Sequence, residues 1–437
     1  MIARLQHWWQ EMLSSFWFLP ASIVGGMILL ATGLIALDAN FELHAERKWP
    51  LVFGAGAAGS RGLLTAVAGS MITVAGVVFS ITIVALSLTS SQYTSRVLRN
   101  FMRDRINQVV LGVFVGIFAY CLVVLRVIRG GDEATFVPSF AVMGGLVLAL
   151  VGIGFLIVFI HHISVSIQAS SIIAAAATET IAAIDHLFPD ELGDDTAIDA
   201  ETSESLDKRA WFPIAACTTG YLESIDSDSL LAWAKKHDTT LRMERAIGEF
   251  VVEGAPLLSM SRPELPTEAS IVELNEVYFI SQQRTVQQDA GFGIRQIVDI
   301  ALKALSPGVN DPTTAVICID YLGAILAQLA GRHIATPHRL DEGTLRVIAR
   351  GPSFESLLKE SFTQIRQNGH SNCVILTRLL ETLETIAKKT KSARRRQAIR
   401  DQAERITETA KCGIPAFHDR APVERSFEQL SRVLNQS

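Results

Sequence analysis

The sequence predicts a membrane protein in which four transmembrane helices are joined to a soluble α+β region. Of its 437 residues, 49% are apolar and only 19% are charged. Residues 1–165 contain ten Lys and Arg and seven Asp and Glu, a net charge of +3, whereas the remaining 29 and 37 give the rest of the chain −8. This composition excludes a disordered chain, a secreted disulfide-rich miniprotein and a basic nucleic-acid-binding protein.

Four segments without any Asp, Glu, Lys or Arg predict membrane crossing. They are Met12–Leu37, Gly62–Ser95, Ile106–Leu125 and Ala134–Thr178. A helix needs about 20 apolar residues to cross the hydrocarbon core, and a charge at its centre costs about 2.5–3.5 kcal/mol. We therefore predict a transmembrane domain over residues 1–165, with spans near 16–37, 63–88, 107–128 and 139–161. The first apolar run is too long for a signal peptide.

Two of the predicted helices extend beyond the bilayer. Residues 63–104 would form a helix of about 60 Å and residues 139–187 one of about 70 Å, at 1.5 Å per residue. No Pro or Gly interrupts Phe155–Leu187. Helices of this length would carry movement between the membrane and the soluble region.

The loop between the second and third spans is basic, which favours a cytoplasmic location. The other loops also carry Arg or Lys, so the soluble region is needed to decide the orientation. It holds four Cys without paired spacing, which suits a reducing compartment; these are Cys217, Cys318, Cys373 and Cys412. Because four spans place both termini on one side, we expect both termini and the soluble region in the cytoplasm.

The second span carries small and hydroxyl-bearing residues on one helical face, because they recur at spacings of three, four and seven. They are Gly69, Thr73, Gly76, Ser80, Ser87 and Ser91. In one interpretation, this stripe lets membrane helices pack closely and its hydroxyls bond to backbone or to a neighbouring helix. In the other, copies of the span surround an axis and the stripe lines a water-filled path for ions. Both can hold together, since packed pore helices also need small residues.

Three arginines, Arg96, Arg99 and Arg103, continue this face beyond the apolar part of the span. In an oligomer they would form basic rings at the inner mouth of a pore, and such rings favour anions. The alternative is contact with lipid head groups. At the end of the fourth span, His161 and His162 point about 100° apart on a helix. They predict packing, hydrogen bonding or pH sensing rather than a metal site.

The soluble region is predicted to have three parts. Residues 166–209 form a helical extension and an acidic linker, residues 210–265 a small β-rich subdomain, and residues 266–437 a mainly helical subdomain. Within the second part, WFPIAAC, TTLRMER and GEFVVEGAPLL are typical of short strands. The glycine-spaced turn between Gly248 and Gly254 resembles that of barrel-sandwich hybrid domains, which include biotinyl and lipoyl carriers. The hairpin that holds the modifiable Lys of those carriers is absent, so we expect no prosthetic group.

Residues 284–330 predict two helices joined by a turn, with Asp311 as N-cap of the second and Pro at its first position. The simplest interpretation is a capped helix hairpin. The alternative is that Asn310 and Asp311, with Arg295 and Asp299 of the first helix, contact a ligand or the membrane part. The sequence contains no Walker loop and no G-x-S-x-G, H-E-x-x-H or C-x-x-C motif. An enzyme, a cofactor and a metal are therefore not expected.

Three runs stand out as family-specific: TVAGVVFSITIVALSLTSSQYTSRVLRNFMRD (Thr73–Asp104), FIHHISVSIQ (Phe159–Gln168) and RTVQQDAGFGIRQIVDIALKALSPGVNDPTTA (Arg284–Ala315). They resemble a bacterial family of predicted membrane proteins that carry a domain of unknown function. The resemblance extends over nearly the whole chain. It implies a multi-pass protein of the bacterial inner (cytoplasmic) membrane, and it implies no reaction, ligand or catalytic residue.

These observations predict a homo-oligomeric ion channel or pore, lined by the second span and regulated by the cytoplasmic domain. Conduction would be passive, because no acidic residue lies within the predicted spans to couple it to protons or cations. The partners would be the lipid bilayer, further copies of the chain and inorganic ions, but not nucleic acid. The alternative is a membrane-anchored scaffold or sensor whose cytoplasmic domain binds a partner.

Overall fold

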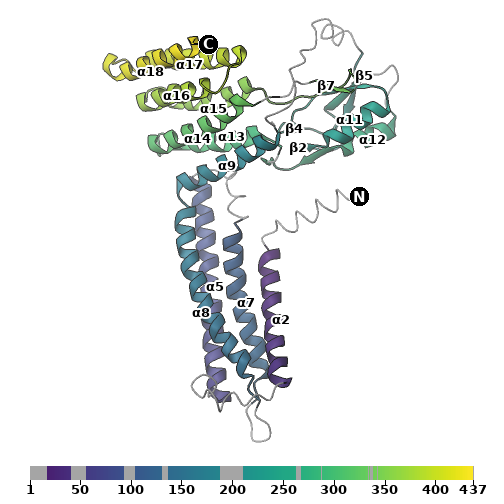
Figure 1. Ribbon diagram of the computed structural model, residues 1–437, viewed down its shortest axis with the longest axis vertical. Coiled ribbons are helices and arrows are strands. Elements are labelled where there is room, and N and C mark those ends of the chain that lie inside the picture. The colour runs from purple at the N-terminus through teal and green to yellow at the C-terminus, as the bar shows by residue number, and fades with distance from the viewer. Residues whose placement is uncertain are drawn as a thin grey trace. The chain divides into compact units, whose positions relative to one another are not determined.

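The computed structural model describes residues 17–40, 56–92, 104–129, 136–187, 210–261, 267–286, 288–332, 334, 338–341 and 343–436. The chain divides into two compact units, Met1–Ser171 and Ile172–Ser437. Figure 1 labels the helices and strands of both units. The predicted spans fall in the first unit, and both β-sheets fall in the second.

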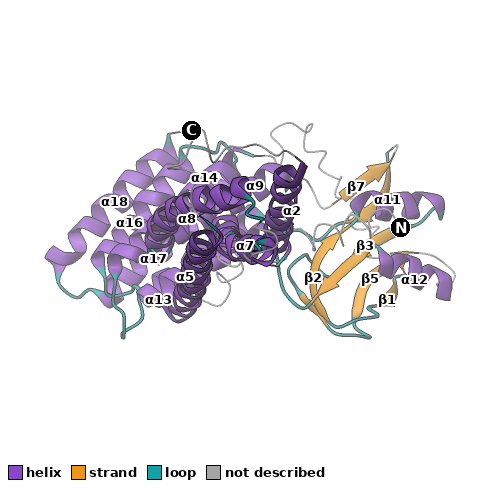
Figure 2. Ribbon diagram, turned by 90° about the horizontal axis from the view of Figure 1, so that it is seen from below, coloured by secondary structure: helices purple, strands orange, loops and turns teal. Residues whose placement is uncertain are grey.

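Four long helices form the first unit, and each covers one of the predicted spans. They are α2 (Phe18–Asn40), α5 (Ala57–Gln92), α7 (Arg105–Val127) and α8 (Ser139–Ser166). Helix α7 contacts each of the other three, and Figures 1 and 2 show the four helices side by side. The unit is therefore a helix bundle organised about α7.

Glycines on α7 allow close packing of α2. A Cβ atom at Gly112 would lie 2.9 Å from the backbone Cα of Pro20, and one at Gly116 would lie 2.9 Å from the side chain of Met27. Small residues four apart let two membrane helices approach until their backbones nearly touch. Helix α2 thus packs on α7 at Gly112 and Gly116.

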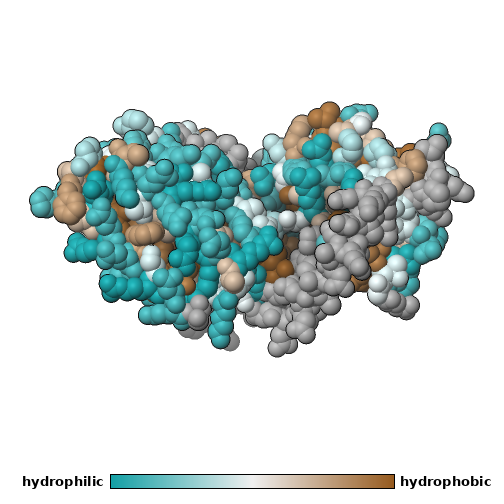
Figure 3. Space-filling model, turned by 90° about the horizontal axis from the view of Figure 1, so that it is seen from above, coloured by the Kyte–Doolittle hydropathy of each residue, from teal (hydrophilic) through white to brown (hydrophobic). Residues whose placement is uncertain are grey.

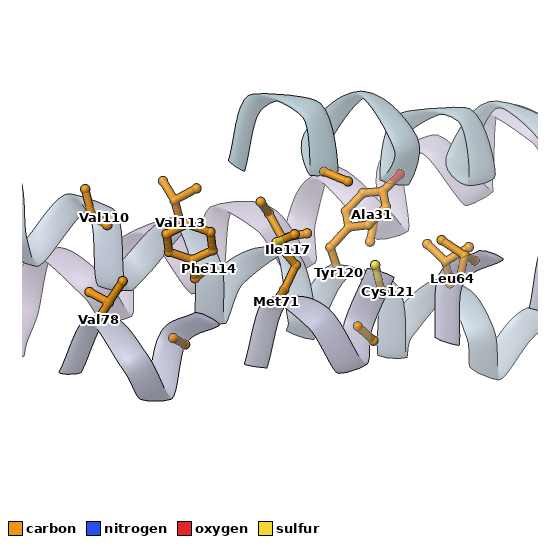
Figure 4. Packing of buried hydrophobic residues seen from close by; sticks show 14 of the residues in the cluster. Ala31, Leu64, Met71, Val78, Val110, Val113, Phe114, Ile117, Tyr120 and Cys121 are labelled. Atoms are coloured by element: carbon orange, nitrogen blue, oxygen red, sulfur yellow. The ribbon is translucent and has the colours of Figure 1, made fainter. Parts of the chain in front are cut away.

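The core of the bundle contains large apolar side chains from α5 and α7, shown in Figure 4. Leu64, Met71 and Val78 come from α5, and Phe114 and Ile117 come from α7; all five are buried. Their spacing of three, four or seven residues gives each helix one continuous buried face. The opposite face of α5 takes no part in this core.

Side chains cap helix ends at one end of the bundle. Asp38 of α2 accepts hydrogen bonds from the N–H groups of Phe140 and Ala141, at the start of α8, over 3.2 and 3.1 Å. Arg61 of α5 donates to the carbonyl of Ile128, just after α7, over 2.7 Å. These bonds satisfy backbone groups that have no partner within their own helix. Helix α2 runs further than the predicted span and so contains Asp38, an acidic residue that serves as a cap.

The other end of the bundle holds an ionisable contact. Asp104 is the N-cap of α7 and accepts from the N–H of Ile106 over 2.9 Å. Its second carboxylate oxygen contacts the ring of His162, near the end of α8. The same ring nitrogen lies 3.2 Å from the hydroxyl of Ser166. These side chains tie the start of α7 to the end of α8.

One of the two very long helices predicted from the sequence, over residues 139–187, is not formed. Helix α8 ends at Ser166, and α9 (Ala169–Leu187) begins only after Ile167 and Gln168. The N–H of Gln168 bonds to the carbonyl three residues back, over 3.1 Å, which tightens and closes the last turn. The prediction for residues 63–104 falls partly on residues 93–103, which lie outside the described residues; α5 is described as far as Gln92, and Asp104 is the N-cap of α7.

The strands of the second unit form two sheets. The larger has the order β1-β5-β3-β8-β7, and the smaller has the order β4-β2-β6. The strands are β1 (Phe212–Ala215), β2 (Gly220–Ile225), β3 (Thr240–Met243), β4 (Phe250–Val251), β5 (Pro256–Ser261), β6 (Tyr278–Ser281), β7 (His338–Asp341) and β8 (Thr344–Ile348). Helix α11 (Ser227–Lys236) contacts β8, and α12 (Glu268–Glu276) contacts β6.

The predicted strands within residues 210–265 are present, and glycines with positive φ, Gly248 (+86°) and Gly254 (+82°), turn the chain between them. Strands β6, β7 and β8 come from a part of the chain predicted to be mainly helical. Strand β8 joins the larger sheet by parallel pairing with β3, with Leu241 opposite Val347. This strand order does not confirm the predicted barrel-sandwich arrangement.

Six helices complete the second unit as three consecutive hairpins. They are α13 (Ala290–Ala304), α14 (Pro312–Gly331), α15 (Phe354–Asn368), α16 (Cys373–Ala387), α17 (Ala393–Gly413) and α18 (Phe417–Asn435). Helices α13, α15 and α17 contact one another in order, and so do α14, α16 and α18. Figure 1 shows the resulting stack.

By length and composition, five described helices could cross a membrane: the four of the first unit and α14. Helix α14 packs against α13, α15 and α16 and buries Cys318, Leu322, Leu326 and Leu329. The face of the second unit visible in Figure 3 is mainly hydrophilic. A mostly helical protein with candidate membrane helices and a sheet-containing C-terminal region is thus confirmed.

Candidate functional site

The small-residue stripe of α5 lies on the outer surface of the protomer. Gly69, Thr73, Gly76, Ser80 and Ser87 are all exposed. The buried face of α5, which includes Leu64, Ala68, Met71, Ala75 and Val78, packs toward α7 and α8. At 3.6 residues per turn, the two sets project from opposite sides of the helix. The stripe is therefore not used to pack the helices of one chain together.

The atoms around the stripe confirm that it is open. A Cβ atom added at Gly69 or Gly76 would meet nothing within 4 Å. The Thr73 hydroxyl donates to the carbonyl of Gly69 over 2.8 Å, so its polar group is satisfied by its own helix. Among the residues that the structure describes, the hydroxyls of Ser80 and Ser87 have no hydrogen-bond partner.

Large apolar side chains flank the stripe on both sides. Val77 and Val84 are exposed on one side, and Phe79 and Ile83 on the other, with exposed fractions of 47–56%. The outward face of α5 thus has a narrow band of small and hydroxyl-bearing residues between two apolar borders. Ser91 belongs to α5, but its side chain lies outside the described residues, as do Arg96, Arg99 and Arg103.

The two histidines of α8 have different surroundings. His161 is exposed, whereas His162 is half-buried in its contact with Asp104. The adjacent rings therefore do not share one site, which agrees with their spacing on a helix. Among the described residues, no group of three His, Cys, Asp or Glu side chains is arranged to hold a metal ion.

The candidate residues of the second unit lie in two places. Arg295 and Asp299 of α13 form an ion pair of 2.7 Å, and Arg295 also donates to Gln364 of α15 over 2.6 Å. Asn310 and Asp311 lie in the turn before α14 instead. They do not form one site with Arg295 and Asp299 in the described contacts.

The turn before α14 is a helix cap. Asn310 is exposed and has a positive φ of +47°. Asp311 accepts from the N–H and the hydroxyl of Thr314 over 3.1 and 2.6 Å, and these bonds lower the pKa of Asp311. The predicted N-cap role of Asp311 is therefore confirmed.

A network of charged side chains lies beside Arg295 and was not predicted from the sequence. Arg284 forms an ion pair of 2.7 Å with the buried Asp289, and Glu360 of α15 lies close to this pair and to Arg295. Asp289 was detectable as a possible N-cap before Ala290. Nothing in the sequence linked it to Glu360, because 70 residues separate the two carboxyl groups.

Comparison with known proteins shows which family the chain belongs to. A family model described as "Predicted membrane protein (DUF2254)" matches residues 13–385. The uncharacterized protein MT1328 of Mycobacterium tuberculosis (strain CDC 1551 / Oshkosh) is 35% identical over 381 residues, which cover 86% of this chain and 73% of the relative. The uncharacterized protein Mb1321c of Mycobacterium bovis shows the same identity and coverage. No solved structure matches the chain. The resemblance inferred from the three sequence runs is thus confirmed, and the chain belongs to the DUF2254 family of predicted membrane proteins.

Proposed function

We propose that the protein is a homo-oligomeric ion channel of the bacterial inner membrane, with passive conduction along a path lined by α5. The observation that carries this proposal is the outward direction of the α5 stripe. Ser80 and Ser87 point away from their own bundle and have no partner among the described residues. A hydroxyl without a partner costs about 2–7 kcal/mol in an apolar medium. Water, a second copy of the chain or the carbonyl of the preceding turn, to which Thr73 bonds, would remove this cost, whereas lipid would not.

A ring of protomers accounts for the whole outer face of α5. If copies of α5 surround an axis, the stripe faces the axis and its apolar borders, with Val77 and Phe79, contact the neighbouring copies. Gly69 and Gly76 leave room along the path, because no side chain projects from them. Hydroxyl groups then replace part of the hydration of a passing ion.

The number of crossings and the orientation follow from the packing of α14 and from the charge of one loop. We assign four crossings, because α14 packs among α13, α15 and α16 of the second unit. An even number of crossings places both termini on one side, and the basic loop at residues 93–103 assigns that side to the cytoplasm. Arg96, Arg99 and Arg103 would then lie at the inner mouth of the path.

The alternative is a membrane-anchored scaffold or sensor. The stack of three helix hairpins supports it, because stacked helix pairs form extended surfaces that bind other proteins. In that case the α5 stripe would serve only for contact between copies of the chain.

The test is conductance of the purified full-length protein in planar lipid bilayers. The wild type should pass current, and Ser80→Leu should strongly reduce it, because Leu fills the stripe with an apolar side chain. Ser22→Leu is the matched control: Ser22 is exposed on α2, lies away from the stripe and its borders, and bonds to the carbonyl of Phe18. The absence of current from an intact wild-type oligomer would reject the channel and favour the scaffold. Equal effects of the two variants would reject the stripe as the lining.

A further inference from the structure

Residues 284–286, 288 and 289 lie where four parts of the second unit meet. A Cβ atom at Gly248, between β3 and β4, would lie 2.7 Å from Nη2 of Arg284. Gln288 accepts from the N–H of Ile225 of β2 over 3.2 Å. Asp289 accepts from the N–H of Phe292 over 2.9 Å and so caps α13. The segment therefore connects the smaller sheet to the helical stack.

Helix α9 packs on the same region. Val286 and Phe292 form a small buried cluster with Ala183 of α9. Gly293 of α13 meets the fully buried Thr180 of α9 so closely that a Cβ atom there would lie 2.9 Å from the Cβ of Thr180. Any shift of residues 284–293 must therefore move α9 or lose these contacts.

Five charged side chains gather at this junction. Arg284 is paired with Asp289 at 2.7 Å, and Arg295 is paired with Asp299 at 2.7 Å. Both pairs interact electrostatically with Glu360 of α15. Two guanidinium groups thus face three carboxyl groups, which leaves one negative charge uncompensated when all are ionised.

The three carboxyl groups differ in their partners. Asp289 accepts from Nε of Arg284 over 2.9 Å and from the N–H of Phe292, and Asp299 has Arg295. Glu360 has neither a hydrogen bond nor an ion pair with any residue that the structure describes. Its carboxylate faces the bare backbone of Gly291, where a Cβ atom would lie 3.5 Å from Glu360 and 3.3 Å from Asp289. Glu360 is therefore the group with the least support for a negative charge.

We propose that this junction is a proton-operated switch, in which Glu360 takes up and releases the proton and thereby sets how firmly α9 is held. With Glu360 protonated, the charges of the cluster balance and Arg284 stays on Asp289. With Glu360 ionised, its charge repels Asp289 and Asp299 and competes for Arg284. Loss of Arg284 from Asp289 weakens the cap of α13 and the contacts of Val286 and Phe292 with α9.

The direction of the pH dependence follows from burial. Burial raises the pKa of Glu360, and Arg284 and Arg295 only partly offset this effect; burial also raises the pKa of Asp289, despite its bonds from Arg284 and the N–H of Phe292. The folded junction then binds the proton more tightly than the unfolded chain does. Its stabilisation is present below the ordinary carboxyl pKa and is lost as the pH rises through the raised pKa. Because one proton is involved, the equilibrium between the junction that holds α9 and the junction that has released it changes by at most about tenfold per pH unit.

The switch acts on the helix that continues from the last predicted span. Only Ile167 and Gln168 separate the end of α8 from the start of α9. A change in how α9 is held thus reaches the membrane part through two residues of backbone. The switch goes beyond the proposed conduction and does not require it, since its readout is the protection of α9.

The test is hydrogen exchange of the full-length protein in lipid nanodiscs, measured by mass spectrometry from about pH 5 to about pH 8. After correction for intrinsic exchange rates, the protection of residues 169–187 in the wild type should fall by about tenfold or more. In Glu360→Gln it should stay high at every pH. In Glu360→Asp, which keeps a carboxyl group, the pH dependence should remain.

Glu355→Gln is the matched control on the same helix. Glu355 is paired with Arg394 at 2.8 Å, and its pKa is lowered, because hydrogen bonds from its own backbone N–H, from Ser353 and from Arg394 outweigh its burial. This variant should keep the wild-type pH dependence of α9. Protection of α9 that is independent of pH in the wild type would overturn the switch. This measurement uses the wild type alone, so it does not depend on whether a variant folds. A pH dependence that survives in Glu360→Gln would overturn the role of Glu360.

Discussion

Helices α7 and α5 both place glycines on one face, yet only the glycines of α7 have neighbours. Gly112 and Gly116 are covered by Pro20 and Met27 of α2, whereas a Cβ atom at Gly69 or Gly76 would meet none of the described residues within 4 Å. The same residue type thus serves packing within the chain in one helix and faces outward in the other. The difference indicates which surface of the bundle remains for other copies or for water.

The largest expected effect is that of Gly112→Leu. The new Cβ would meet the backbone of Pro20, which cannot move without shifting α2. We expect a loss of about 3 kcal/mol in the free energy of unfolding, the upper part of the usual range for overpacking. Thermal unfolding in detergent, followed by tryptophan fluorescence, measures it. Gly154→Leu is the control, because a Cβ at Gly154 of α8 would meet nothing within 4 Å. Equal stability of both variants would contradict the seating of α2 on α7.

A smaller effect is expected for Tyr120→Phe, one turn further along α7 from Gly116. Tyr120 is fully buried, and its hydroxyl donates to the carbonyl of Ala141 of α8 over 2.6 Å. Removing this hydroxyl should destabilise the bundle by about 1 kcal/mol. The same unfolding assay detects the change. An unaltered melting temperature would show that α8 does not depend on this bond.

The smallest effect on the protomer is expected for Gly76→Leu. Its side chain would enter open space, so the free energy of unfolding of the protomer should change by no more than about 1 kcal/mol. A small increase is expected, because Leu has a higher helix propensity than Gly. If the stripe faces other copies, the oligomer should dissociate although the fold is kept. Native mass spectrometry in detergent distinguishes the two properties. An intact oligomer with unchanged current would show that α5 forms neither the contact between copies nor the conduction path.

The sequence identifies the four helices of the bundle because charges are excluded from them. It does not reveal that α8 stops at Ser166, because no Pro or Gly is present and the last turn is closed by backbone hydrogen bonds. Strands β7 and β8 form a local antiparallel hairpin whose turn contains Gly343, and this signal was overlooked. Strand β8 pairs in parallel with β3, about 100 residues earlier, and such pairing leaves no local pattern.

The candidate site was only partly predictable. Periodicity gives the face of α5 that carries Ser80 and Ser87, but only the packing on α7 and α8 reveals that this face points outward. The cluster of Arg284, Asp289 and Glu360 could not be found from spacing, because it combines a loop with a helix that is distant in the sequence. Asp311, by contrast, was predicted as a cap because capping is a local interaction.

The hairpin formed by α17 and α18 has a consequence for the free end of the helix stack. Each hairpin of the stack covers the apolar side of the one before it, and α18 covers α16, whose Leu376, Leu379, Leu380 and Leu383 are fully buried. The family model ends at residue 385, before this last hairpin begins. Helices α17 and α18 act as a terminal lid, in the manner of the polar end repeats that keep solenoids soluble. Without them, the open end would present a leucine-rich surface on which stacks from separate molecules could grow end to end.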